Sequence, residues 1–166
     1  MCAIASGWLG RRLEQKRRET EIVAAIAKLG GVVEYDYQRS PPGKPFGPDW
    51  LRRLLGENFF NDVVFVDFQR VPIKVGDADL ASVQELTTLK VLWLNGDKIT
   101  DAGLDHVKGL IRLESLGLGG TMITDAGLLK LKGLTKLQDL SLGGTSVSFD
   151  GEVELQKALP NCVISR

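Results

Sequence analysis

The 166 residues are 43% apolar and 25% charged, which is the composition of one ordinary globular domain. Basic and acidic residues number 21 each, so the chain has no net positive field of the kind that drives nucleic-acid binding. The two cysteines, Cys2 and Cys162, stand at opposite ends of the chain, which excludes a disulfide framework and a thiolate metal cluster. We therefore expect free thiols, since an end-to-end bridge would need the two termini to meet, and we expect neither a cofactor nor a nucleic-acid partner.

Residues 1–18 form an apolar and then basic leader. Its apolar part is too short to cross a bilayer, which takes about 20 residues, and its charges follow the apolar run, unlike those of a secretory signal. Trp8 followed by Arg11 and Arg12 is typical of the end of a membrane helix. One hypothesis is that the leader is the remnant of an anchor that begins upstream of Met1, which predicts a membrane-associated protein. The alternative is a frayed leader without a role, in an otherwise cytoplasmic protein.

Residues 19–59 are predicted to form an N-terminal cap. The helical spacing of residues 11–29 ends at Gly30-Gly31. Basic residues on this helix are interleaved with glutamates, which suits either a solvated face or a phospholipid-binding patch. The alternation that follows predicts a strand, one side of which carries Val33, Tyr35 and Tyr37.

The second half of the cap starts with a proline-rich segment. Three prolines and two glycines between Pro41 and Gly47 predict a surface loop, either a connector or a ligand for a partner's aromatic groove. Pro48 then opens a short helix, one side of which is predicted to carry Trp50, Leu51, Leu54 and Leu55. Together the helices and the strand can close the open end of a repeat array.

A repeat of 24 residues organises residues 60–166. Six residues from Ile99 to Leu104 return unchanged from Ile123 to Leu128. The surrounding apolar frame also recurs, at Leu86, Leu89, Leu92 and Leu94, at Leu110, Leu113, Leu116 and Leu118, and at Leu134, Leu137, Leu140 and Leu142. This fixed period predicts a solenoid, with a degenerate first repeat near Phe60, about four repeats in all, and a C-terminal strand.

The alternation within each strand predicts which side chains are free to bind. Leu92 and Leu94 should point into the core, and the residues between them should point outward. The strands are therefore predicted to stack as a parallel sheet. The candidate partner-binding residues are the outward ones, namely Phe65, Asp67, Val91, Trp93, Asn95, Ser115, Gly117, Asp139 and Ser141. Trp93, the largest of them, either anchors a partner or packs on its neighbours or on the cap.

The remaining repeated residues are predicted to be structural. We expect Thr100 and Thr124 to cap helices, and the aspartates after them, Asp101 and Asp125, to face the positive helix ends. Successive helices should pack closely at Gly103 and Gly127. Positive φ or close backbone approach is expected in the turns that leave the strands, at Gly96, Gly119-Gly120 and Gly143-Gly144.

The pattern Leu-x-x-Leu-x-x-Leu-x-Leu followed by Thr-x-Ile-Thr-Asp-Ala-Gly-Leu resembles bacterial leucine-rich-repeat proteins with 24-residue units, which are similar in pattern to the cysteine-containing type of F-box adaptors. The resemblance implies an α/β fold, a curved leucine-rich-repeat solenoid with parallel strands on the concave side and helices on the convex side. It also implies that the protein binds other proteins. The sequence departs from many such families where they place an asparagine after the strand. Here that position holds Asp97, Thr121 or Thr145, so threonine side chains must satisfy the turn backbone. The basic N-terminal helix is also similar to the membrane-proximal region of such proteins, which favours the anchor hypothesis.

The predicted function is a non-enzymatic protein-interaction module that uses the concave sheet to bind an unknown protein. A membrane-proximal scaffold or self-assembly domain is the alternative. A four-repeat sheet offers about the 800 Å² per partner of a standard interface. An enzyme requires convergent acid, base or nucleophilic groups, and the single histidine, His106, is expected on the surface of a convex helix.

Overall fold

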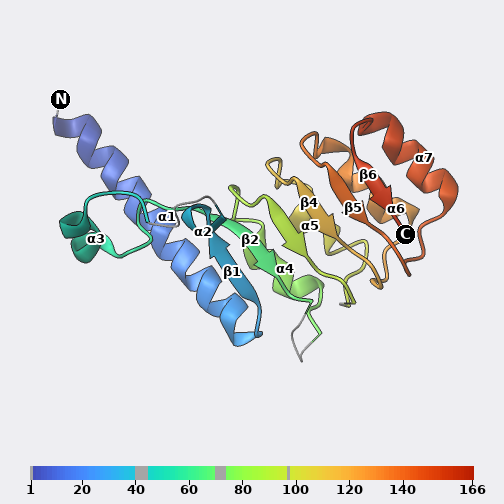
Figure 1. The fold of residues 1–166 in the computed structure, drawn as a ribbon, viewed down its shortest axis with the longest axis horizontal. Coiled ribbons are helices and arrows are strands. Elements are labelled where there is room, and N and C mark those ends of the chain that lie inside the picture. The colour runs from blue at the N-terminus through green and yellow to red at the C-terminus, as the bar shows by residue number, and fades with distance from the viewer. Residues whose placement is uncertain (1, 40–44, 70–73, 97) are drawn as a thin grey trace.

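One six-stranded sheet organises the chain, with its strands side by side in sequence order (Figure 1). The computed structural model describes residues 2–39, 45–69, 74–96 and 98–166. Strand β1 pairs antiparallel with β2, and all later neighbours pair in parallel. The strands are β1 (Val32–Tyr35), β2 (Val63–Asp67), β3 (Val91–Trp93), β4 (Ser115–Gly117), β5 (Asp139–Ser141) and β6 (Val163–Ser165).

The strand register carries the period of the sequence into the structure. Ser115 lies opposite Asp139, and Asp139 lies opposite Val163, so neighbouring strands align residues 24 positions apart. Phe65 pairs with Val91, which is 26 positions later, so the degenerate first repeat is two residues longer than the others. Identical frame positions therefore stack directly above one another.

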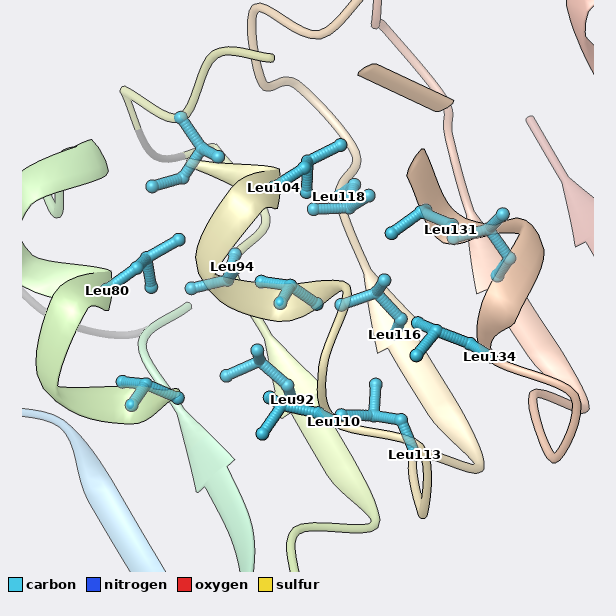
Figure 2. Packing of buried hydrophobic residues seen from close by; sticks show 14 of the residues in the cluster. Leu80, Leu92, Leu94, Leu104, Leu110, Leu113, Leu116, Leu118, Leu131 and Leu134 are labelled. Atoms are coloured by element: carbon cyan, nitrogen blue, oxygen red, sulfur yellow. The ribbon is translucent and has the colours of Figure 1, made fainter. Parts of the chain in front are cut away.

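Short helices return the chain from one strand to the next on one side of the sheet. These elements are η1 (Asp77–Asp79), α4 (Leu80–Val83), α5 (Leu104–Val107), α6 (Asp125–Leu128), η2 (Leu129–Gly133) and α7 (Phe149–Ala158). Leu92 of β3 and Leu94, directly after this strand, are fully buried together with helix residues such as Leu104, and Figure 2 shows the leucines meeting between the strands and the helices. Burying each leucine contributes about 1.5 to 3 kcal/mol, so this frame dominates stability. The fold is a leucine-rich-repeat solenoid.

A long helix covers the N-terminal end of the sheet. Helix α1 (Cys2–Lys28) runs without a break across residues 18 and 19, where the sequence suggested a division between leader and cap. Its C-terminal half packs on the sheet through Ile22 and Ile26, which are 7% and 1% exposed. It ends at Lys28, and the expected glycine stop follows at Gly30, which has a φ of 86°.

A buried ion cluster fixes α1 to the start of β2. The Lys16 ammonium contacts Glu19 at 2.7 Å and the backbone carbonyl of Asn61, and Arg12 contacts Asp62 at 2.9 Å. Burial raises the pKa of Glu19. Because these charges are largely removed from water, the pairing satisfies groups that would otherwise destabilise the docked helix.

Two predictions for the cap were wrong in detail. The strand ends at Tyr35, and Tyr37 lies in the short helix α2 (Asp36–Arg39), where its ring stacks on that of Tyr35. Helix α3 (Asp49–Leu55) also differs, because Leu51 and Leu55 are half-buried while Trp50 and Leu54 are exposed. Of the proline-rich segment, residues 40–44 lie outside the described residues.

A carboxylate clasp joins each repeat to the next. Asp101 accepts hydrogen bonds from the backbone N–H of Thr124 at 2.8 Å and from its hydroxyl at 2.6 Å. Asp77 does the same with Thr100, and Asp125 with Ser148. The aspartates therefore bind the following repeat. Asp125 also stands in the first turn of α6, as predicted, whereas Asp101 lies three residues before α5.

The threonines of the clasp differ in their local roles. Thr124 caps α6 as expected, accepting a hydrogen bond from Ala126. Thr100 lies four residues before α5 and accepts from Ala102 within a turn. Downstream of the strands, the hydroxyls of Thr121 and Thr145 donate to the carbonyls of Leu118 and Leu142, so threonine does satisfy the turns; Asp97 lies outside the described residues.

Glycine makes room for the clasp. A Cβ on Gly103, Gly127 or Gly151 would stand 2.4, 2.1 or 2.3 Å from a carboxylate oxygen of the preceding repeat. The predicted close packing is thus confirmed, and the aspartate is what approaches. Positive φ is also confirmed in the turns after the strands, at Gly96, Gly120 and Gly144.

The stability of the solenoid should depend on pH in the acidic range. Hydrogen bonds from Lys108 and Lys130 lower the pKa of Asp105 from 3.8 to about 2, and hydrogen bonds from Ser148 lower the pKa of Asp125. The unfolded chain therefore binds protons more readily, and this stability is lost as the pH falls from about 4 to about 2. We expect the thermal midpoint to fall across that window, and to fall less in Asp105→Asn. An equal fall in the variant would contradict the assignment.

Candidate functional site

The face of the sheet turned away from α4 to α7, here called the open face, carries one shallow depression. Its volume is about 340 Å³. The lining comes from successive strands and the turns after them, and consists of Gln69, Trp93, Asn95, Ser115, Leu116, Gly117, Asp139, Leu140, Ser141, Val163 and Ser165. The depression exists because strands β4 to β6 place small side chains where β3 places Trp93.

A fixed asparagine crosses the floor. The Asn95 Oδ1 atom accepts a hydrogen bond of 2.6 Å from the backbone N–H of Gly119. A Cβ on Gly117 would lie 2.7 Å from the Asn95 amide nitrogen, so only glycine leaves room for this arrangement. Glycine at position 117 thus deepens the depression and allows the Asn95 side chain to link two neighbouring repeats through its hydrogen bond to Gly119.

An edge-to-face aromatic pair forms one wall of the depression. The ring of Trp93 meets the ring of Phe65 edge to face, with centroids 5.4 Å apart. The guanidinium of Arg39 lies 4.7 Å from the Phe65 ring centroid, so α2 covers the N-terminal end of the open face. Trp93 therefore does pack on a neighbour, and it also remains half-exposed toward the depression. Its orientation is set before any partner arrives.

The structure brings together six of the nine predicted binding residues. Those in the lining are Trp93, Asn95, Ser115, Gly117, Asp139 and Ser141. Phe65 is 6% exposed because Trp93 and Arg39 cover it, so its prediction as a contact residue was wrong. Asp67 accepts a hydrogen bond from the backbone of Gln69, and neither it nor Val91 lines the depression.

The far wall was missing from the predicted site. Val163 and Ser165 of β6 lie in register with Asp139 and Ser141. Adding 24 to the numbers of the β5 residues would have found them, but their short strand lacks the leucines that mark the repeat. Gln69 lies on the same alternating row as Phe65 and Asp67, and its place in the lining follows from that alternation.

The chemistry of the lining suits recognition. Asp139 supplies an exposed negative charge next to hydroxyl groups and an aromatic wall. Burial, with a smaller contribution from Asp139, raises the pKa of the nearby Cys162 thiol to about 11, so this thiol stays protonated at neutral pH. Across the described residues, no group of three or more histidine, cysteine or acidic side chains is placed to hold a metal ion. His106 bonds Gln84 on the helix side of the sheet.

No family model and no curated protein matches the chain. Among solved structures, a leucine-rich-repeat protein of Leptospira interrogans is 24% identical with a TM-score of 0.39, over 52% of this chain and 27% of that one. An internalin of Listeria monocytogenes is 19% identical with a TM-score of 0.39, over 52% of this chain and 31% of that one. The chain thus spans less than a third of the length of these two proteins.

Proposed function

We propose that the protein is a non-enzymatic interaction module that binds a protein partner on its open face. The observation that carries the proposal is the depression between Trp93 and the small residues of β4 to β6. Helices cover the other face of the sheet, whereas this face presents five parallel strands, β2 to β6, with an aromatic wall. A flat polar surface would give a partner little to hold, but a preset tryptophan beside a hollow supplies an anchor point.

The size of the depression favours a protruding segment of a protein. About 340 Å³ lies at the lower limit of small-molecule pockets, which enclose most of their ligand. Here the floor is one shallow layer formed by Ser115, Gly117 and Ser141, so a ligand would keep one side in solvent. A side chain inserted beside Trp93, with the rest of the partner spread along the strands, fits this shape.

The proposal can be tested without knowing the natural partner. A displayed library of random peptides is selected on the whole protein, and the affinity of each selected peptide is measured by calorimetry. We expect Ser141→Arg, which fills the depression, to weaken binding at least tenfold. Loss of the tryptophan in Trp93→Ala should weaken binding about 30-fold, the effect of a 2 kcal/mol hot spot.

Matched variants separate binding from folding. Ile111→Arg introduces the same side chain at a residue that is 62% exposed and outside the depression, and it should leave affinity unchanged. Trp93→Ala also removes the contact with Phe65, so its unfolding is measured in parallel. Peptides whose affinity is the same for wild type and Ser141→Arg would sink the proposal.

The finer family assignment is also a proposal. We propose that the chain is a bacterial protein with repeats similar to the cysteine-containing type. The register of 24 residues between strands supports the repeat length of this assignment. Within the described part of the chain, no helix is long and apolar enough to cross a membrane. The hypothesis of a membrane anchor is tested by the coding sequence upstream of Met1. An in-frame apolar run there would support the anchor, and an in-frame stop codon directly upstream would contradict it.

A further inference from the structure

Helix α3 presents an apolar face to solvent. Trp50 is 66% exposed and Leu54 is 73% exposed, and Arg53 shares their side of the helix because residues three and four apart are neighbours on a helix surface. Phe46, just before the helix, is 56% exposed. No residue of α3 is buried. Such a group of aromatic, aliphatic and cationic side chains on one short helix requires an explanation.

The orientation of α3 is fixed from its other side. The Arg52 guanidinium donates to the carbonyls of Pro45 and Gly47 at 2.9 and 2.8 Å and reaches Glu57 at 3.2 Å. Gly47 in turn lies directly against the ring of Phe60. The half-buried Arg52 therefore holds the helix in place, and the Trp50 face is held outward.

The N-terminal part of α1 lies at the same end of the molecule. Arg11, Arg12 and Gln15 line a cavity of about 390 Å³ together with Phe60, which connects α1 to the base of α3. Leu9 and Leu13 on α1 are 38% and 42% exposed. Figure 1 shows the N-terminal half of α1 extending past the sheet, with α3 beside it.

Charge distinguishes this end from the solenoid. Residues 1–60 contain ten basic and seven acidic side chains, whereas residues 61–166 contain eleven basic and fourteen acidic ones. Most arginines of the N-terminal end are paired, but among the described residues neither Arg11 nor Arg53 has a carboxylate partner. Positive charge is thus available next to the exposed apolar residues.

We propose that this N-terminal end docks on the surface of an anionic membrane. Trp50 and Leu54 insert at the level of the headgroups, and Arg53 and Arg11 meet acidic lipids. Amphipathic helices with tryptophan and leucine beside arginine bind the interface in this way, and each basic residue near the surface strengthens binding about fivefold. A second copy is a poorer occupant, because a symmetric contact would place Arg53 against the same basic surface of its partner.

The test uses the whole protein and sedimentation with lipid vesicles. Vesicles of phosphatidylcholine are compared with vesicles that contain 30% phosphatidylserine, at low and at physiological salt. We expect tighter binding to the anionic vesicles and weaker binding as salt rises. Arg53→Gln should lower the partition coefficient about fivefold, as expected for one charge. Trp50→Ala/Leu54→Ala should lower it at least tenfold.

The matched control is Ile111→Ala/Met122→Ala, which removes two apolar side chains that are 62% and 55% exposed on the solenoid. It should bind vesicles like the wild type, and all variants should keep the wild-type circular dichroism. The proposal fails if the wild type does not sediment with anionic vesicles, or if the α3 variant and the control bind equally. It also fails if ultracentrifugation shows a lipid-free dimer that Trp50→Ala/Leu54→Ala dissociates, because a second copy then covers this face.

Discussion

Leu116→Ala should lower the free energy of unfolding by about 2 to 5 kcal/mol, the usual cost of emptying a leucine site in a packed core. Leu116 is 1% exposed at the centre of β4 and lies in register between Leu92 and Leu140. Its removal leaves a cavity that borders two repeats at once, so neither neighbour can close it alone. Urea unfolding followed by circular dichroism measures the change.

The control for this prediction is Ile111→Ala, since Ile111 is also a branched apolar residue and is 62% exposed. A surface change of this kind should stay within about 0.5 kcal/mol. Comparable losses in the two variants would mean that the stacked leucines do not hold the solenoid together. A second transition in Leu116→Ala alone would show that the repeats on either side of β4 had become uncoupled.

The repeated part of the fold could be predicted because its rules are local. Alternation along a strand is enough to place Leu92 inside and Trp93 outside, and the period of 24 then sets the register of each following strand. The same period places Asn95 and Gly119 at equivalent positions in the turns that follow β3 and β4. It does not reveal that they share a hydrogen bond, since that depends on how far a side chain reaches across the sheet.

The cap was harder because it occurs once. Nothing in the sequence repeats the pairing of β1, so its antiparallel place beside β2 and its early end at Tyr35 came only from the structure. Trp50 shows the same difficulty. An apolar residue on a short helix is normally expected to face the core, but α3 is held through Arg52, which turns Trp50 outward.

Strand alternation predicted which residues occupy the outward row of the sheet, but not how far each of them is exposed. Ser115 is half-buried and lines the depression, as strand alternation predicts, whereas Gly117 is buried beside the Asn95 amide. Phe65 lies on the same outward row but is buried, because the Trp93 ring and the Arg39 guanidinium of α2 cover it. Contacts between side chains of unrelated segments are not encoded in any local period.

The sequence shows in which repeats the series of carboxylate clasps begins and stops, once the geometry of the clasp is known. In the first repeat, Asp79 occupies the position that Gly103 holds in the second. A glycine is not required there, because no aspartate of an earlier repeat approaches this position. The Asp79 carboxylate instead accepts a hydrogen bond from the backbone N–H of Gly76. At the other end, Phe149 stands at the position of Asp101 and Asp125 and is 71% exposed. Within the described residues the clasp therefore starts at Asp77 and ends at Ser148.

Gly127→Ala should destabilise the protein by about 2 kcal/mol, although alanine in a helix is normally favoured over glycine by up to about 1 kcal/mol. The new Cβ would stand 2.1 Å from the Asp101 carboxylate and 3.1 Å from its Cα, so the two repeats must separate. Gly133→Ala is the matched control, because its Cβ would meet nothing within 4 Å. That variant should be unchanged or more stable by a few tenths of a kcal/mol.

A double-mutant cycle then tells whether the clasp is the cause. Asp101→Ala removes two hydrogen bonds to Thr124 and should cost about 1 to 2 kcal/mol, since the carboxylate is partly exposed. In Asp101→Ala/Gly127→Ala the added methyl group occupies the space that the carboxylate leaves, so the double variant should be more stable than the sum of the single losses by at least about 1 kcal/mol. Strict additivity would instead mean that Gly127 is needed for its own backbone, and that the contact with Asp101 is incidental to how the repeats join.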